Sequence, residues 1–155
     1  MSSNARATGP AFREGPLLQV FVAGQLAGEL LRRELGETTT GPRFAVVSVI
    51  GALGPITPTE LARRLGMAPT TVSSWLARLE GEAVAERRAN PADGRSQLIE
   101  LTESGRRELR TALPEFDRAA TRVRDALGED LDEVLDALGR LVEGLRVALV
   151  ENTSS

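Results

Sequence analysis

The spacing of hydrophobic and polar residues predicts a chain that is mainly helical. After Pro16, apolar residues recur at helical spacing at Leu17, Phe21, Leu26, Leu30, Leu31 and Leu35. A break at residues 36–41 precedes a second and denser apolar segment, which opens at Pro42 and ends at residues 54–55. A helix with so many apolar positions is expected to be buried, as core scaffold.

Residues 57–81 predict two short helices joined by a tight turn. The first of these helices has a clear start signal. Thr57 can cap the helix, Pro58 suits the first helical position, and Glu60 completes a capping box with Thr57. Gly66 ends this helix, because glycine adopts a left-handed conformation at little cost. The second helix then has one apolar face, formed by Met67, Val72, Trp75, Leu76 and Leu79.

The opposite face of the second helix is small, hydroxylated and free of acidic residues before Glu80. A solvated face usually mixes acidic and basic residues, so this composition favours contact with phosphates and base edges. An ordinary exposed face rich in serine and threonine is the alternative. The candidate DNA-binding residues on this helix are Thr70, Thr71, Ser73, Ser74 and Arg78.

Two strands, residues 83–88 and 96–101, are predicted to follow, joined by a turn rich in Asn, Pro, Asp and Gly. Arg87, Arg88 and Arg95 place three cations on this hairpin as further candidate DNA contacts. An arginine at a hairpin tip suits a narrow minor groove, where the negative potential is enhanced. Asp93 is expected to orient the Arg95 guanidinium. The alternative for these two side chains is a surface ion pair that contributes about 0–1 kcal/mol.

This part of the chain resembles the MarR family of bacterial transcription regulators. The resemblance rests on the segments ITPTELARRLG, TTVSSWLARLE and RRANPADGRSQLIELTESG, the last of which is similar to the wing of that family. It implies a winged helix-turn-helix that binds double-stranded DNA. Two positions depart from the family's pattern. Ser74 stands where a basic residue is frequent, and residues 83–85 read Ala-Val-Ala where Gly-Leu-Val is usual.

A long polar helix is predicted after Thr102, with a kink or an interruption at Pro114, since an interior proline costs about 3 kcal/mol. Gly128 separates a last helix, which has acidic residues in its first turn. This helix has more apolar surface than one neighbour can cover. It is therefore expected to pack against a second copy of the chain, with a monomeric helical bundle as the alternative.

We therefore predict one MarR-like domain over residues 15–150, mainly α with a small β-wing. Residues 57–102 are the winged helix-turn-helix lobe, and residues 15–40 and 103–150 are the flanking dimerisation helices. Residues 1–14 are predicted to be a mobile N-terminal arm and residues 151–155 a tail.

Composition limits the chemistry of this 155-residue chain, which has no cysteine and no histidine. A Ser-His-Asp triad, a cysteine nucleophile and a His/Cys zinc site are therefore excluded. No catalytic residue, metal site or cofactor is predicted, and the protein is not expected to be an enzyme. No apolar run approaches the roughly 18 residues that span a bilayer, so a cytoplasmic protein without a membrane segment is expected.

The net charge of −3 is unevenly distributed along the chain. Residues 1–56 carry +1, residues 57–102 are neutral, and residues 103–155 carry −4. The acidic charge therefore gathers outside the predicted DNA-binding lobe. Only modest non-specific binding to DNA is expected, because phosphate binding depends on the local field.

The predicted function is transcriptional regulation by a homodimer, as a repressor bound to a pseudo-palindromic operator. In the family that this chain resembles, a small aromatic or anionic ligand often releases the DNA. Phe12, Arg43 and Phe44 are the candidate ligand-binding residues. The alternative is a winged helix that binds another protein, which the low net charge and Ser74 favour.

Overall fold

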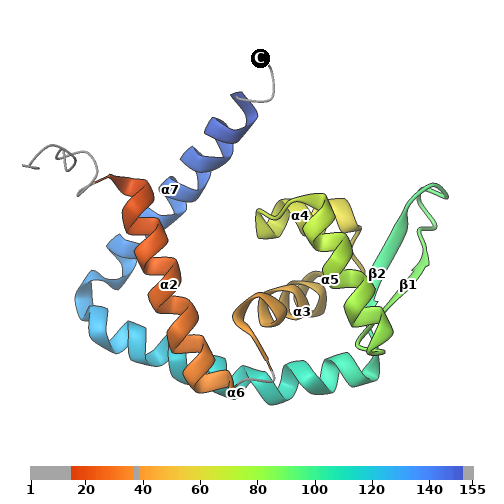
Figure 1. The fold of residues 1–155 in the computed structure, drawn as a ribbon, viewed down its shortest axis with the longest axis horizontal. Helices are drawn as coiled ribbons and strands as arrows, with labels where there is room; N and C mark the ends of the chain where they lie inside the picture. Colours follow the sequence, from red (N-terminus) through yellow and green to blue (C-terminus); the bar gives the residue numbers. More distant parts are fainter. Residues whose placement is uncertain (1–14, 37–38, 152–155) are drawn as a thin grey trace, which may run out of the picture. The chain divides into compact units, whose positions relative to one another are not determined.

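The computed structural model describes residues 15–36 and 39–151 and confirms a mainly helical fold with a small β-wing (Figure 1). The elements are α2 (Pro16–Leu35), α3 (Gly41–Leu53), α4 (Pro58–Leu65), α5 (Pro69–Gly81), β1 (Ala85–Ala89), β2 (Gln97–Leu101), α6 (Glu103–Leu127), the 3-10 helix η1 (Gly128–Asp130) and α7 (Leu131–Glu151). The chain divides into two compact units, Met1–Asp117 and Arg118–Ser155. The predicted arm, residues 1–14, and residues 152–155 of the predicted tail lie outside the described residues.

Threonine side chains fix the starts of helices in the first unit. Thr40, Thr57 and Thr102 each accept a hydrogen bond from the backbone N–H three residues on, at 3.4, 3.2 and 3.1 Å. Such a cap satisfies a donor that the helix leaves free and typically contributes about 1 kcal/mol. The left-handed Gly66, with φ of 63°, ends α4. The predicted start and end of α4 are thus confirmed.

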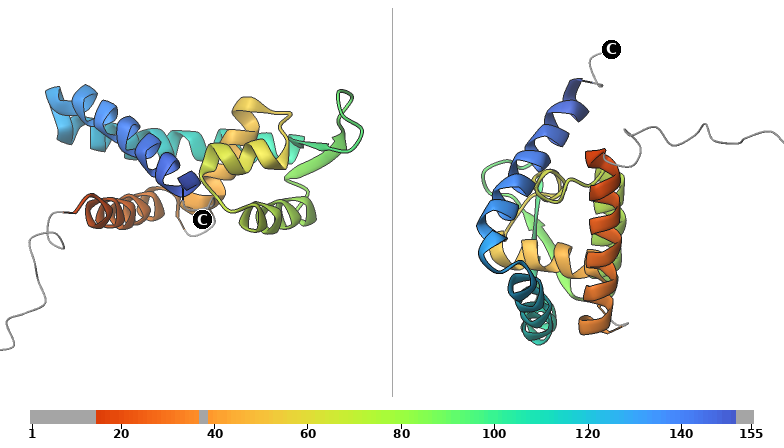
Figure 2. Two further views of the ribbon diagram at one scale, coloured as in Figure 1. Left: turned by 90° about the horizontal axis from the view of Figure 1, so that it is seen from above. Right: turned by 90° about the vertical axis from the view of Figure 1, so that its left-hand side faces the viewer.

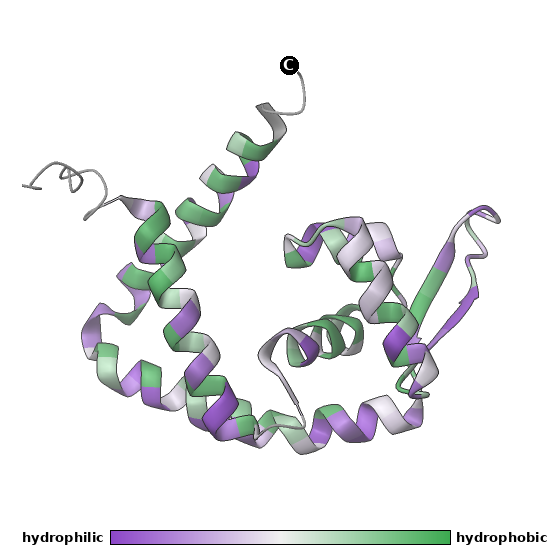
Figure 3. Cartoon of the chain, viewed as in Figure 1, coloured by the Kyte–Doolittle hydropathy of each residue, from purple (hydrophilic) through white to green (hydrophobic). Residues whose placement is uncertain are grey.

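The core of the first unit lies between α3, α4, α5 and the two strands. Figure 3 shows α3 as predominantly hydrophobic, in agreement with the predicted buried scaffold helix. Ile56 pairs with Ile99 as an isolated antiparallel bridge, which joins the segment before α4 to the wing. Each large apolar side chain buried here contributes about 1.5–3 kcal/mol. The largest fully buried side chains are Val46, Val47, Ile50, Leu61, Val72, Leu76, Leu79 and Ile99.

The wing is an antiparallel pair of strands that projects from these helices (Figure 2). Its register runs from Ala85 opposite Leu101 to Ala89 opposite Gln97. The prediction that the first strand begins at residue 83 is wrong. Ala83 has a φ of 55°, so the backbone turns there between α5 and β1. The Thr102 hydroxyl donates to the Ala83 carbonyl oxygen at 2.6 Å and holds this turn against the start of α6.

Pro114 does not interrupt α6, contrary to one of the two outcomes predicted for it. Proline removes one backbone donor from the helix, but packing on both sides of it supplies compensation. Ala112 joins Leu35 and Phe44 in a second buried cluster, and the Phe116 ring stacks on Phe44 at 4.6 Å between centroids. Tertiary contacts therefore hold the helix through the proline.

The second unit contains the end of α6, η1 and α7. Gly128, with φ of 56°, begins η1 and confirms the predicted separation of the last helix. Several large apolar side chains of α7 are exposed, namely Leu135, Leu138, Val142, Val147 and Leu149. Within the first unit, α2 likewise exposes Leu17, Phe21, Val22 and Leu26. The excess of apolar surface predicted for the last helix is therefore present, and α2 exposes apolar side chains as well.

Candidate nucleic-acid interface

The polar face of α5 is open to solvent. Val72, Leu76 and Leu79 are at most 1% exposed and anchor the helix to the core. The residues predicted to contact DNA lie on the other side and are all exposed: Thr70, Thr71, Ser73, Ser74 and Arg78. The structure therefore gathers the whole predicted set on one accessible face.

The centre of this face is formed around Trp75, which is only partly buried. The Arg78 guanidinium carbon lies 5.8 Å from the centre of the Trp75 ring, within the range of a cation–π contact. Together with Thr71 and Ser74, these two side chains line a hollow of about 330 Å³. The Ser74 hydroxyl donates to the Thr70 carbonyl oxygen at 3.0 Å, so its donor is engaged within the helix. Sequence periodicity placed Trp75 wholly on the buried face and did not reveal its contact with Arg78.

Most of the predicted DNA-binding arginines pair with carboxylates of the same lobe. These pairs are substantially exposed, and such ion pairs contribute about 0–1 kcal/mol. The carboxylates offset the charge of these arginines within the lobe. Because the pairs are weak, each arginine can still exchange its carboxylate for a DNA phosphate. The pairs are Arg78 with Glu82 (2.9 Å), Arg87 with Glu80, and Arg88 with Glu100 (3.6 Å).

Arg95, at the tip of the wing, differs from these arginines. Within the described residues its guanidinium has no carboxylate partner. Asp93 was expected to bind the Arg95 guanidinium, and this is wrong. Its Oδ1 atom instead accepts a hydrogen bond from the Arg95 backbone N–H at 3.0 Å. That bond closes a local turn, which an aspartate forms readily with the backbone two residues on. Asp93 thus shapes the loop, and the Arg95 cation remains available.

A cavity of about 680 Å³ in the first unit is lined by α2, α3, α6 and the α2–α3 connection. Its charged lining residues include Arg33, Arg43, Arg107, Glu34 and Glu108. Of the predicted ligand-binding residues, the structure brings Arg43 to this cavity. Phe44 packs in the core against Phe116 instead, and Phe12 lies outside the described residues.

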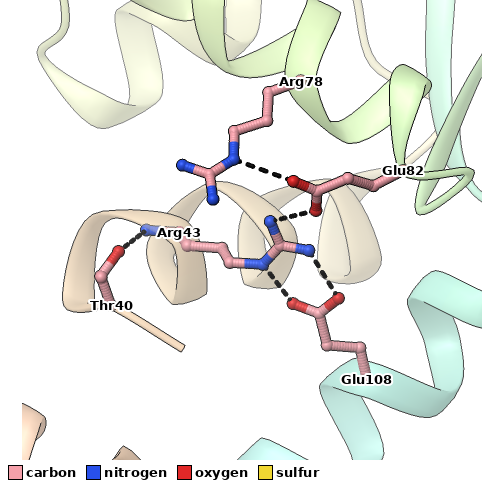
Figure 4. Close-up of polar contacts among 5 residues, drawn as sticks. All are labelled: Thr40, Arg43, Arg78, Glu82 and Glu108. Carbon is pink, nitrogen blue, oxygen red and sulfur yellow. Dashed lines mark hydrogen bonds and ion pairs between the residues drawn. The ribbon is translucent and has the colours of Figure 1, made fainter. Parts of the chain in front are cut away.

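Arg43 also belongs to a network that the sequence did not reveal (Figure 4). Its Nε and Nη2 atoms donate to the two carboxylate oxygens of Glu108 at 2.7 and 2.9 Å. Its Nη1 atom lies 2.6 Å from Oε2 of Glu82, whose other oxygen accepts from Arg78. The bonds to Glu108 and then Glu82 raise the pKa of Arg43, whereas the bonds from Arg78 and then Arg43 lower the pKa of Glu82. Arg43, Glu82 and Glu108 lie far apart in sequence, so no local pattern could indicate the bonds of Arg43 in this network.

For residues 15–36 and 39–151, no helix is both long and apolar enough to cross a bilayer. Within the same ranges, no three acidic, histidine or cysteine side chains are grouped so as to hold a metal ion.

Comparison with known proteins relates these elements to one family. The MarR family model matches residues 39–97, which run from the start of α3 into the wing. The HTH-type transcriptional repressor YetL of Bacillus subtilis is 32% identical over 93 residues, which are 59% of this chain and 56% of YetL. The chain therefore spans little more than half the length of this relative.

Two solved structures match nearly the whole fold. One is the PcaV transcriptional regulator of Streptomyces coelicolor in complex with its natural ligand, at 25% identity and a TM-score of 0.76. The match covers 89% of this chain and 96% of PcaV. The other is a MarR variant of Escherichia coli complexed with operator DNA, at 25% identity and a TM-score of 0.74, covering 87% and 99% of the two chains.

Proposed function

We propose that this chain is a member of the MarR family and that it regulates transcription by binding a specific DNA sequence as a homodimer. The observation that carries this proposal is the accessible polar face of α5, which has no acidic residue over positions 70–79, beside a wing whose Arg95 is free of a carboxylate partner among the described residues. The similarity to a regulator complexed with operator DNA supports it.

Each element of the lobe has a distinct role in this proposal. The hydroxyl-bearing residues of α5 approach base edges in the major groove, namely Thr70, Thr71, Ser73 and Ser74. Arg78, Arg87 and Arg88 exchange their carboxylates for phosphates. Arg95 enters the minor groove next to the site.

Dimerisation by the flanking helices would place two copies of α5 about one DNA turn apart. The exposed apolar side chains of α2 and α7 support this part of the proposal, because contiguous apolar surface on a monomer favours association. Two equivalent lobes would then read a pseudo-palindromic operator, with residues 15–40 and 103–150 as the dimerisation helices.

We further propose that the protein is a repressor and that a small aromatic or anionic ligand releases it from DNA. The relative YetL is a transcriptional repressor, and the matched PcaV structure holds its natural ligand. The cavity of about 680 Å³ beside Arg33, Arg43 and Arg107 offers a compartment for such a ligand. A ligand that binds one arrangement of the two DNA-binding lobes better than another shifts the dimer toward the arrangement it prefers. If that arrangement does not fit the operator, the dimer releases the DNA.

The competing function is a winged helix that binds another protein. The observation that favours it is the internal pairing of Arg78, Arg87 and Arg88, which leaves the lobe with little net charge.

Fluorescence anisotropy with the intergenic DNA upstream of the gene, beside an unrelated duplex, separates these functions. DNA regulation predicts tight binding to the first duplex that weakens as salt rises. Equal and weak binding to both duplexes would favour the protein-binding alternative.

A further inference from the structure

Among the described residues, Arg43 is the charged side chain that the fold buries, at 8% exposure. It lies in the first turn of α3, where its backbone N–H donates to the capping hydroxyl of Thr40. All of its guanidinium nitrogens bind carboxylates, with Glu108 on α6 and Glu82 at the end of α5 as partners (Figure 4). Arg43 therefore joins three elements and has no path of its own to DNA.

Glu82 is the shared member of this network. One of its oxygens binds Arg43 and the other binds Arg78, so a single negative charge is divided between two cations. Arg78 is 63% exposed at its side chain and lies over Trp75 on the proposed DNA face. These contacts connect Glu108, which lines the cavity, through Arg43 and Glu82 to Arg78 on α5.

We propose that Arg43 is a positioning residue for DNA recognition, which acts on Arg78 through Glu82. By binding one oxygen of Glu82, Arg43 limits how far Glu82 offsets the charge that Arg78 presents to phosphate, and it fixes the direction of the Arg78 guanidinium. Without Arg43, Glu82 would pair with Arg78 alone and cancel the positive charge that Arg78 presents to the DNA backbone. This proposal rests on the proposed DNA-binding function and adds a residue that touches no DNA.

Double-mutant cycles on operator binding test this coupling. Arg43→Gln is expected to weaken binding on the order of fivefold to tenfold in the wild-type background and not at all in the Arg78→Gln background, because the effect passes through Arg78. The control is Glu29→Gln, which removes a carboxylate shared between Arg32 and Arg33 on α2, so any effect it has on binding should be the same in both backgrounds. An equal loss from Arg43→Gln in both backgrounds would overturn the proposal.

Rescue distinguishes positioning from a general loss of structure. Glu82→Gln removes the negative charge and leaves an amide oxygen to accept from Arg78, at a side chain that is 39% exposed. The double variant Arg43→Gln/Glu82→Gln should therefore bind within about twofold of the wild type. A double variant as weak as Arg43→Gln alone would contradict the role of Glu82.

A third measurement needs no DNA. Trp75 is the only tryptophan, so its emission reports the position of Arg78. Arg43→Gln should change this emission, and Glu29→Gln should not. Unchanged Trp75 emission in a folded Arg43→Gln variant would overturn the positioning role. If the wild type failed to bind DNA but the emission still changed, the network would stand and the DNA-binding proposal would fail.

Discussion

Ala83 occupies a backbone conformation that L-residues with a Cβ adopt only at a cost. Its φ of 55° lies in the left-handed region, where glycine is free of that penalty. Ala83→Gly is therefore expected to stabilise the protein by about 0.5–1 kcal/mol. Thermal unfolding checks this, with Ala77→Gly in the exposed interior of α5 as the control, since the same kind of change there should destabilise by about 1 kcal/mol. A loss of stability from Ala83→Gly would show that Ala83 makes contacts worth more than its strain.

Arg95 is the residue on which the wing's proposed role depends. Arg95→Ala should weaken operator binding and reduce the slope of log K against log salt by about 1, because one cation fewer displaces counterions. Arg32→Ala is the matched control, since Arg32 lies on α2 and binds Glu29. A slope equal to that of the wild type would count against a contact between Arg95 and DNA.

At the scale of elements, two helical glycines differ in their surroundings: one is closely packed, and the other lies on an open helix surface. A Cβ at Gly105 would lie 2.1 Å from the Val84 carbonyl oxygen, whereas a Cβ at Gly139 would meet nothing within 4 Å. Gly105→Ala should therefore cost about 1–3 kcal/mol by forcing α6 away from the wing. Gly139→Ala should stabilise α7 by up to about 1 kcal/mol. Chemical denaturation of the two variants checks this, and the same sign for both would contradict the described contact between α6 and the wing.

The Glu82 network gives α5 a dependence on pH. Bonds from Arg78 and then Arg43 hold the pKa of Glu82 below the 4.5 of an unpaired glutamate. The stability that these bonds add is fully present above about pH 4.5 and is lost as the pH falls through the lowered pKa. The difference in unfolding free energy between the wild type and Glu82→Gln should therefore shrink as the pH falls from 6 through the lowered pKa of Glu82. A difference that stays constant over this range would exclude a contribution from this ionisation.

Local sequence patterns predicted the elements whose causes are local. The bounds of α2 follow from Pro16 and the break at residue 36, and the caps at Thr57 and Thr102 follow from residue types within one turn. The pattern also predicted which face of α5 is exposed, because one face must pack on the core.

Features that depend on tertiary contacts were not predictable in this way. α6 continues through Pro114 because Phe116 stacks on Phe44, a residue on a different helix. Arg43 meets Glu82 and Glu108 only after three elements have packed together. For Asp93 the residue was identified but not its bond, since a backbone turn and a guanidinium contact need the same residue types.

At the scale of the whole molecule, charge and apolar surface are divided between different parts of the chain. Residues 103–155 carry a net charge of −4, while the lobe of residues 57–102 is neutral. The exposed apolar side chains lie mainly on α2 and α7, and the hydroxyl-bearing face lies on α5. This division is the one that a dimeric DNA-binding protein requires, with association and recognition on separate surfaces.

In the proposed complex, α5 reads the major groove and the wing reaches the minor groove, in two copies on one operator. Footprinting of the upstream DNA with dimethyl sulfate, which methylates guanine N7 in the major groove, and with hydroxyl radicals, which cut the deoxyribose backbone, tests this arrangement. We predict two protected major-groove segments with centres about 10 base pairs apart, flanked by minor-groove protection that Arg95→Ala removes while the central segments persist. A single protected segment, or flanking protection that survives Arg95→Ala, would contradict the account.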